Sequence, residues 1–395
     1  MTDSTEDKKT SQPATAIIHR GRNPSAQHGF VNPPVYRGST VLFPDLATLE
    51  SGKQAYTYGR KGHPTMRALE EALCTLDGGA RTILTSSGLA AVTTALLSFA
   101  KAGDHVLVAD TCYRPTRMFC DEVLSGLGVA VTYYDPLIGA GIAELFRANT
   151  RVVYTESPGS QTFEVQDIPA IAAACRPREI WLLLDNTWAT GRYCKPFEHG
   201  ADVAIQAGTK YVVGHADAML GVVTAGTRAA KQLQKMHWLI GDCAGSEEIF
   251  LGLRGLRTMD LRLRQHHAGG LELARWLQLR PEVAAVLHPA LPDFPGHALW
   301  KRDFLGASGL FSIVLRSASR SGLAAMLDGL SLFGMGYSWG GYESLVVPFD
   351  PAHYRTATQS EFAGRSCLRL HIGLEDVADL KHDLEAGFAR FAAAA

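Results

Sequence analysis

Short apolar runs alternate with amphipathic stretches between about residues 64 and 253, and this alternation constrains the fold more than any other feature. The apolar runs predict buried strands, because they are short and rich in Val, Ile and Leu. They fall at residues 82–85, 105–108, 129–134, 151–155, 180–184, 202–206 and 221–225, with helical patterns at 89–99, 115–124, 142–147 and 168–175. Strands of this kind predict an α/β domain, in which helices cover both faces of a mostly parallel sheet.

The two flanks of this region have a different character. Residues 1–60 are irregular and broken by prolines such as Pro24, Pro33 and Pro34, so we expect an arm that wraps the main domain or another subunit. The polar first ten residues lack an apolar signal core and suggest a disordered leader. Beyond residue 258, a long amphipathic helix precedes strands at 310–315 and 368–372 and a closing helix at 377–391. The expected parts are an arm (1–60), a large domain (61–257) and a smaller α+β C-terminal domain (258–395).

Charge and cysteine usage exclude several classes of function. Lys and Arg total 38 against 39 Asp and Glu, interleaved throughout, so no nucleic-acid partner is expected. No apolar run is long enough to span a bilayer, so no membrane partner is expected. The seven cysteines are scattered without Cys-x-x-Cys spacing, which argues against disulfides or zinc. Cysteines as free thiols suit a reducing compartment, and we expect a cytoplasmic protein. His266 and His267 are adjacent on a predicted helix and cannot face the same way, so no metal site is expected.

Two polar residues follow predicted strands and could do chemistry together. Lys210 lies just beyond the strand at 202–206, and Asp185 ends the strand at 180–184. Ligands of parallel sheets bind outside the carboxyl ends of the strands. A lysine that forms a Schiff base and a carboxylate that holds a pyridinium nitrogen are what pyridoxal phosphate requires. Taken singly, a surface lysine and a turn aspartate are the more common interpretations.

Three further features fit such a site. The segment Ser86–Ala91 follows a strand and opens a helix near Gly88, where main-chain N–H groups can bind phosphate, although a serine-capped junction is also common. Tyr113 could stack on a flat ring, and Arg369 could bind a carboxylate with two parallel hydrogen bonds. Packing and surface roles are the ordinary alternatives for both. No Gly-x-Gly-x-x-Gly follows a strand, which disfavours a dehydrogenase.

Nearly the whole chain, from about residue 15, resembles the Cys/Met-metabolism family of pyridoxal-phosphate enzymes, which has the aspartate-aminotransferase-like fold (fold type I). The resemblance rests on Tyr56-Thr-Tyr-Gly-Arg60 with Pro64-Thr65, Ser86-Ser-Gly-Leu89, Asp185-Asn-Thr187 and Gln206-Ala-Gly-Thr-Lys210-Tyr-Val-Val-Gly-His215. Several motifs in one order make a chance match improbable.

Within the family the chain most resembles the bacterial β-lyases that cleave cystathionine. The relevant segments are Asp135-Pro-Leu-Ile-Gly139, Glu156-Ser-Pro-Gly159, Tyr337-Ser-Trp-Gly-Gly-Tyr-Glu-Ser344 and Arg369-Leu-His-Ile-Gly-Leu-Glu-Asp376. Relatives with γ-chemistry usually carry leucine at the position of Trp339. That tryptophan is the main reason to expect β-elimination.

The resemblance also implies a role for each matching residue. Lys210 would form the Schiff base and act as the base, and Asp185 would pair with the ring nitrogen. Tyr113 would stack on the ring and, with Lys210, count among the catalytic residues. The main chain of Gly88 and Leu89, with Thr209, would hold the phosphate. Arg369, with Ser338 and the main chain at Trp339, would bind the substrate carboxylate.

A neighbouring subunit is expected to complete the site. Tyr58 and Arg60 would reach the phosphate from that subunit, with Tyr58 also near the substrate, in a tetramer built from two active dimers. Two positions depart from the family pattern: Ala207 stands where many relatives have a phosphate-binding serine, and Ser160 where many have asparagine. The resemblance therefore does not decide which cofactor contacts Ala207 and Ser160 make.

The implied activity is β-elimination of cystathionine to homocysteine, pyruvate and ammonia in methionine biosynthesis, with cystine or cysteine-type substrates as further possibilities. The alternatives are γ-elimination or γ-replacement on the same scaffold, and a regulatory protein that only binds the cofactor.

Overall fold

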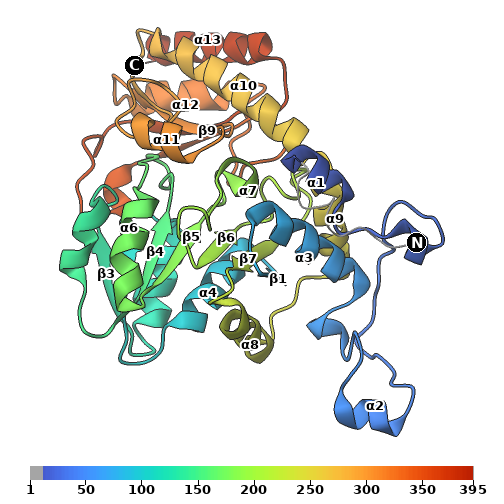
Figure 1. Cartoon of the computed structure of the whole chain (residues 1–395). Helices are drawn as coiled ribbons and strands as arrows, with labels where there is room; N and C mark the ends of the chain where they lie inside the picture. Colours follow the sequence, from blue (N-terminus) through green and yellow to red (C-terminus); the bar gives the residue numbers. More distant parts are fainter. Residues whose placement is uncertain (1–11, 395) are drawn as a thin grey trace.

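A seven-stranded sheet forms the centre of the computed structural model, which describes residues 12–394 (Figure 1). The strands are β1 (Arg81–Thr85), β2 (His105–Ala109), β3 (Ala130–Tyr134), β4 (Thr150–Glu156), β5 (Trp181–Asp185), β6 (Val203–Gln206) and β7 (Gly221–Ala225). Each lies within one residue of its predicted bounds. The continuous burial of strands such as β2, β6 and β7 explains why their sequences are apolar throughout.

The strand order is β1-β7-β6-β5-β4-β2-β3, and neighbours from β6 to β3 run parallel. Strand β7 is antiparallel to both β1 and β6. Residues 207–220, which join β6 to β7, contain no helix that could return the chain across the sheet. The sheet is therefore mostly parallel, and the segment after β6 stays at the carboxyl end of the strands.

Helices cover both faces of this sheet. Strand residues alternate between the faces, so Leu183 packs with the cluster under α4, while Leu182 and Leu184 pack with the cluster that includes α3 and α6. The helical segments of this region are α3 (Pro64–Asp77), α4 (Gly88–Phe99), α5 (Arg114–Met118), η3 (Phe119–Leu124), η4 (Gly139–Leu145), α6 (Ile168–Cys175), η5 (Arg176–Arg178), α7 (Thr190–Tyr193) and α8 (Ala230–Ile240). The helix predicted at 115–124 divides into α5 and the π-helical η3, and that at 142–147 is the 3₁₀ segment η4.

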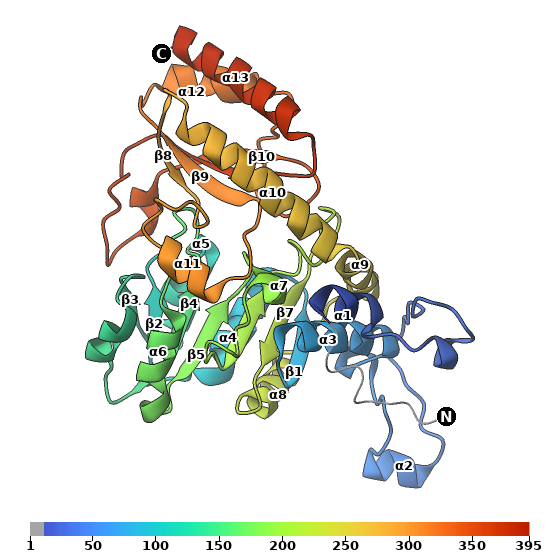
Figure 2. The same cartoon turned by 45° about the horizontal axis from the view of Figure 1, so that its top comes forward.

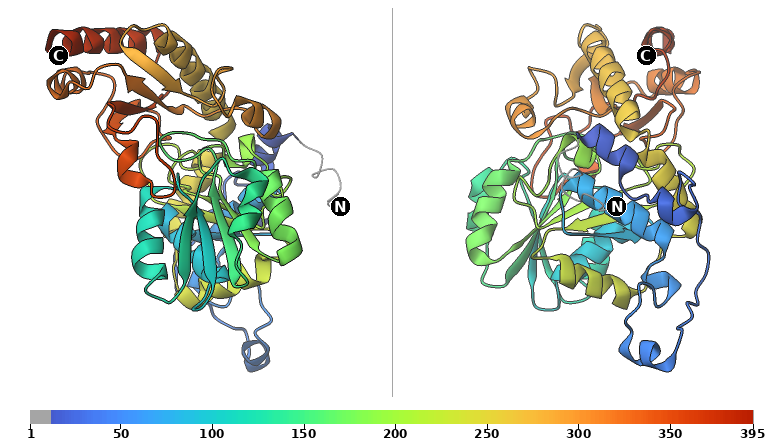
Figure 3. Two further views of the ribbon diagram at one scale, coloured as in Figure 1. Left: turned by 90° about the vertical axis from the view of Figure 1, so that its left-hand side faces the viewer. Right: turned by 45° about the vertical axis from the view of Figure 1, so that its right-hand side comes forward.

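A smaller α+β region packs above the carboxyl ends of the large sheet (Figures 2 and 3). Its antiparallel sheet has the order β10-β11-β9-β8. Helix α9 (Ser246–Leu256) packs on α3 and leads into this region. The elements of the smaller region are α10 (Met259–Gln278), β8 (Val283–Leu287), α11 (His297–Asp303), β9 (Leu310–Leu315), α12 (Arg320–Asp328), β10 (Leu345–Phe349), η6 (Pro351–Tyr354), β11 (Cys367–His371) and α13 (Val377–Ala394). The sequence predicted α10, β9, β11 and α13, but not β8 and β10.

From residue 12 onward, the N-terminal segment contains only short helices, as its prolines predict: α1 (Pro13–His19), η1 (Pro24–Gln27), α2 (Leu46–Ser51) and η2 (Gly59–Lys61). Helix α1 packs on α3 and buries Ile17, whereas the segment around α2 projects away from the domain (Figure 1). Large apolar side chains on this projection are exposed, including Leu42 and Leu46. The predicted leader lies outside the described residues. None of the helices in the described part of the chain combines the length and the apolar character that a membrane span requires.

Candidate active site

A cavity of about 550 Å³ lies at the carboxyl ends of β4 and β5, between the large sheet and the smaller region. Nine of the eleven residues singled out from the sequence line it. They are Gly88, Leu89, Tyr113, Asp185, Thr209, Lys210, Ser338, Trp339 and Arg369. The structure thus brings together residues from both regions of the chain. The role of each residue stays a prediction.

Lys210 lies in the turn after β6, and its side chain reaches the smaller region. Its Nζ donates a 2.6 Å hydrogen bond to the hydroxyl oxygen of Ser338 and lies 5.2 Å from the centroid of the Trp339 ring. Burial and the nearby charge of Arg369 lower the pKa of Lys210 to about 8, against a smaller opposing effect of Asp185. The amine is therefore much easier to deprotonate than an ordinary lysine.

Asp185 is the last residue of β5 and is fixed by hydrogen bonds on both carboxylate oxygens. Thr187 donates from its main-chain nitrogen and its hydroxyl to Oδ1, at 3.0 and 2.6 Å, and the Tyr154 hydroxyl donates to Oδ2 at 3.2 Å. Burial raises the pKa of Asp185, while these donors and Lys210 oppose that rise. The arrangement presents an oriented carboxylate to the cavity.

The beginning of α4 provides the expected anion site. The hydroxyl of Ser87 accepts from the nitrogen of Ala90 and caps the helix, whereas helix geometry leaves the N–H groups of Gly88 and Leu89 without intrahelical acceptors. A Cβ at Gly88 would lie 2.5 Å from the Cβ of Ala207, so this close approach requires glycine. Such a helix start binds phosphate groups well.

The two departures from the family pattern and Thr209 have other contacts. Ala207 packs against the start of α4, and its nitrogen donates to the Thr187 hydroxyl at 2.9 Å. The Thr209 hydroxyl exchanges hydrogen bonds with the main chain of Leu220 and also lines the cavity. The Ser160 main-chain nitrogen donates to the oxygen of Thr111 at 2.8 Å. The contact of Thr209 with a phosphate stays a prediction.

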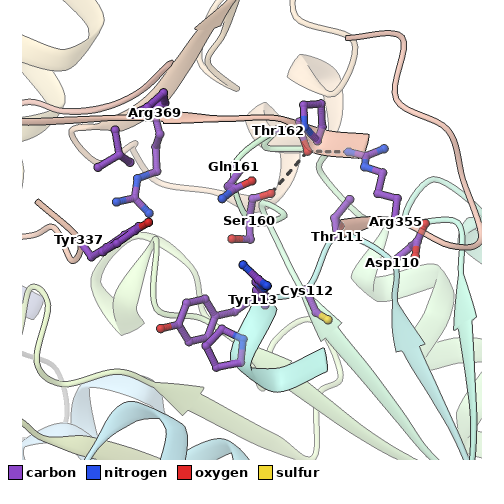
Figure 4. Close-up of a pocket in the computed structure, with 15 residues that line it drawn as sticks. Asp110, Thr111, Cys112, Tyr113, Ser160, Gln161, Thr162, Tyr337, Arg355 and Arg369 are labelled. Atoms are coloured by element: carbon purple, nitrogen blue, oxygen red, sulfur yellow. Dashed lines mark hydrogen bonds between the residues drawn. The ribbon is translucent and has the colours of Figure 1, made fainter. Parts of the chain in front are cut away.

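Tyr113 follows β2 and stands just before α5, with 47 % of its surface exposed. Its main-chain nitrogen donates a 2.7 Å hydrogen bond to Oε2 of Glu156. Its phenol ring lies in the space between the two regions of the chain (Figure 4). An aromatic side chain at this location suits a flat ligand.

Arg369 approaches the cavity from β11 in the smaller region. Its Nη2 donates to the main-chain oxygen of Ser338 at 3.1 Å. His371, two residues further along the same strand, accepts a 3.0 Å hydrogen bond on Nε2 from the nitrogen of Gly340. One strand therefore supplies the guanidinium group and supports the loop that carries Ser338 and Trp339.

A second cavity of about 220 Å³ adjoins the first and shares Tyr113, Ser160, Gln161, Tyr337 and Arg369 with it. Figure 4 shows Arg369 and Tyr337 on one side of this space, with Arg355 and Asp110 at its other end. Arg355 contacts Glu164 in an ion pair and donates to the Thr162 hydroxyl at 2.6 Å. The far end is thus occupied by contacts between the two regions.

Tyr58 and Arg60 do not line the cavity of their own chain. Tyr58 is 45 % exposed, and Nη1 of Arg60 donates to the main-chain oxygen of Trp238 at 3.0 Å. Their contribution to a neighbouring subunit stays a prediction.

Sequence reasoning missed Glu156 as a site residue. It ends β4, pairs in register with Asp185 of β5 and lines the larger cavity. The available signal was its position at the carboxyl end of a predicted strand. In the sequence it stood out only as the first residue of a family motif.

The groups around the larger cavity fit pyridoxal phosphate. A lysine amine, an oriented carboxylate, an aromatic ring and a free helix start converge there, and the tight contact between Gly88 and Ala207 shapes the helix start for close approach. Among residues 12–394, no group of three or more His, Cys, Asp or Glu could hold a metal ion.

Comparisons with known proteins agree with this geometry. Residues 14–389 match the model of the Cys/Met metabolism PLP-dependent enzyme family. Cystathionine beta-lyase MetC of Escherichia coli is 46 % identical over 95 % of this chain and 98 % of its own. An L-alanine/L-glutamate racemase of Wolbachia pipientis is 39 % identical over 95 % of this chain and 96 % of its own. The crystal structure of metB from Corynebacterium glutamicum superposes with a TM-score of 0.90 at 29 % identity, covering 97 % of this chain and 99 % of that one. The protein therefore belongs to the Cys/Met-metabolism family of enzymes, which depend on pyridoxal phosphate.

Proposed function

We propose that this enzyme cleaves the Cβ–S bond of cystathionine by β-elimination. With the uptake of one water molecule, the products are homocysteine, pyruvate and ammonia, and the reaction would serve methionine biosynthesis. Cystine and cysteine-type amino acids are proposed as further substrates. The observation that carries the proposal is the position of the Lys210 amine, which donates a hydrogen bond to Ser338 and lies 5.2 Å from the centroid of the Trp339 ring. The named β-lyase relative supports the same choice.

Pyridoxal phosphate, when bound, supplies an electron sink for the negative charge that develops at Cα. Lys210 would hold it covalently, and Asp185 would hold its ring nitrogen. Tyr113 would contact the ring face. The N–H groups of Gly88 and Leu89, with Thr209, would hold the phosphate.

Lys210 is the proposed general base and acid. Burial and Arg369 lower the pKa of Lys210 to about 8, so an appreciable fraction of the amine is neutral near neutral pH. In this role Nζ removes the proton from Cα and delivers a proton to the departing sulfur. The hydroxyl of Ser338 holds Nζ in place between these two transfers.

Arg369 is the proposed partner of the substrate α-carboxylate. A guanidinium group can bind a carboxylate through two parallel hydrogen bonds, which fixes its orientation as well as its position. The hydrogen bond from Nη2 to the Ser338 oxygen orients this side chain at the cavity. Substrate bound there would lie close to the Lys210 amine.

A neighbouring subunit is proposed to complete each site with Tyr58 and Arg60, in a cytoplasmic tetramer of two active dimers. The exposed apolar residues of the N-terminal segment, among them Leu42 and Leu46, support a contact with another subunit. Arg60 lies outside the cavity of its own chain, which is compatible with a role in another chain.

Product identification tests the proposed reaction. Purified enzyme loaded with cofactor is incubated with cystathionine, and the keto acid is identified by mass spectrometry. Pyruvate is the expected product. 2-Oxobutyrate would instead establish γ-elimination, and no turnover would favour a regulatory protein. The Wolbachia relative is named as a racemase. Incubating the enzyme with L-alanine and measuring D-alanine tests for that activity here.

A further inference from the structure

Glu156 and Asp185 end two neighbouring parallel strands. They are partners in the β4–β5 register, and both line the larger cavity. Side chains of directly paired residues project from the same face of a sheet. Two carboxyl groups consequently lie side by side at the carboxyl edge of the sheet, although the proposed mechanism uses only Asp185.

The side chain of Glu156 joins β4 to the segment that carries Tyr113. Its Oε2 accepts a 2.7 Å hydrogen bond from the main-chain nitrogen of Tyr113, immediately after β2. Its own main-chain oxygen accepts a 2.9 Å hydrogen bond from Nε2 of Gln166. Glu156 is therefore held at its main chain while its carboxyl group holds Tyr113.

The hydrogen bonds also indicate which carboxyl group carries the charge. Asp185 accepts from both donors of Thr187 and from the Tyr154 hydroxyl, whereas the Glu156 carboxyl group accepts from Tyr113. Burial and the negative charge of Asp185 raise the pKa of Glu156 well above its ordinary value. Glu156 is half-buried and Asp185 is buried, and two such neighbouring carboxyl groups retain one charge most readily on the group with more donors.

We propose that Glu156 is a positioning residue that fixes Tyr113 against the cofactor, while Asp185 carries the single negative charge of the pair. The carboxyl oxygen of Glu156 acts as a hydrogen-bond acceptor, and its second oxygen carries the proton. This proposal rests on cofactor binding and on the role proposed for Tyr113, and is independent of which amino acid is cleaved.

Three variants of the cofactor-loaded enzyme test it. Glu156→Gln keeps an acceptor oxygen and has no charge, Glu156→Ala removes the acceptor, and Glu144→Gln is a control at an exposed carboxylate. The readouts are the visible circular dichroism per bound cofactor and the rate of cofactor loss on dialysis. For Glu156→Ala we expect weaker dichroism and about fivefold faster loss, as for one lost hydrogen bond. Glu156→Gln and the control should match the wild type in both.

Two results would overturn the proposal. If Glu156→Gln and Glu156→Ala weaken the dichroism and speed cofactor loss equally, an ionised Glu156 is required. If Glu156→Ala matches the wild type in both readouts, Glu156 does not position Tyr113. Far-UV circular dichroism checks folding, and if Glu156→Ala does not fold, Glu156→Leu keeps the volume without the acceptor. Both readouts are made without substrate, so failure of the cystathionine assay does not affect them.

Discussion

The Nζ atom of Lys210 donates a 2.6 Å hydrogen bond to the hydroxyl oxygen of Ser338, although 128 positions separate them in the chain. Ser338 has a φ of +78°, a conformation that residues other than glycine rarely adopt. Its main-chain oxygen also accepts a hydrogen bond from Arg369. One strained residue therefore links the proposed base to the proposed carboxylate-binding group.

Replacing Ser338 by alanine is expected to slow catalysis without abolishing it. Hydrogen bonds to charged groups contribute about 1.5–3 kcal/mol, so kcat/KM should fall roughly tenfold to hundredfold. The measurement is the steady-state rate of pyruvate formation from cystathionine. Ser317→Ala, at an exposed position of the same region, is the matched control. Unchanged kinetics in Ser338→Ala would show that the hydroxyl does not assist Lys210.

The reactivity of Lys210 should change with pH over an unusually low range. In cofactor-free protein, an amine-specific reagent should label Lys210 half-maximally near pH 8, since burial and Arg369 lower its pKa from 10.5 to about 8. Exposed Lys231 is the internal control. Arg369→Gln should move the midpoint upward, because it removes a positive charge. Peptide mass spectrometry gives the labelled fraction, and a midpoint equal to that of Lys231 would contradict this assignment.

The same shift predicts how stability depends on pH. The folded-state pKa of Lys210 lies below its unfolded value, so between about pH 8 and 10.5 the unfolded chain binds more protons. The contribution of Lys210 to the free energy of unfolding should therefore rise with pH across this window. Urea unfolding of cofactor-free wild type and Lys210→Met at several pH values measures the difference between their free energies of unfolding. A difference that does not change with pH would argue against a lowered pKa of Lys210.

The strands of the large sheet were predictable because burial on both faces leaves an unbroken apolar signal. The same signal is enough to place Asp185 and Lys210 at one edge of the sheet from the sequence alone. Strand β10 was missed because it contains Pro348, which is tolerated only at a sheet edge, where β10 lies. Strand β8 was missed although Val283–Leu287 is apolar throughout, because two of its central residues are alanines, which are depleted in strands.

Local sequence patterns could not predict the contacts between the large domain and the smaller region. Ser338 and Trp339 lie in a segment without periodicity, and only the family resemblance identified them. Nothing local indicates that Ser338 meets Lys210. Glu156 was missed for a related reason, since an acidic residue at a strand end is commonly solvated. Its importance depends on its pairing with Asp185 and its contact with Tyr113.

A shared site predicts complementation between one variant that retains cofactor poorly and one variant that is inactive. Arg60→Ala should release cofactor faster, and Lys210→Ala should lack both elimination activity and the visible absorption of the linked cofactor. A mixed dimer would contain one site with both residues intact, so random mixing should restore about one quarter of wild-type activity. Pyruvate formation after subunit exchange is the measurement, with unmixed variants as controls. No recovery after verified exchange would place Arg60 outside its neighbour's site.

Asp110 joins the two regions of the chain at the far end of the second cavity. Its carboxylate accepts hydrogen bonds from the nitrogens of Thr356, Ala357 and Thr358, at 2.9, 3.0 and 2.8 Å. Arg117 donates to it at 2.6 Å. Burial raises the pKa of Asp110, but the hydrogen bonds from Thr356, Thr358 and Ala357 outweigh burial and hold it below the ordinary value.

Removing this carboxylate should loosen the contact between the regions. We expect Asp110→Ala to lower the free energy of unfolding by about 3 kcal/mol, because it leaves the Arg117 charge and several main-chain donors without their acceptor. Asp135→Ala, at an exposed aspartate that accepts from Leu137, should cost less than about 1 kcal/mol. The pKa of Asp110 is lower in the folded protein than its unfolded-state value of 3.8. Asp110 therefore contributes its full stabilisation above pH 3.8, and this contribution disappears as the pH falls through the folded-state pKa. The difference between wild type and Asp110→Ala in urea unfolding should consequently shrink under acid conditions, and a constant difference would exclude an ionised Asp110 as its source.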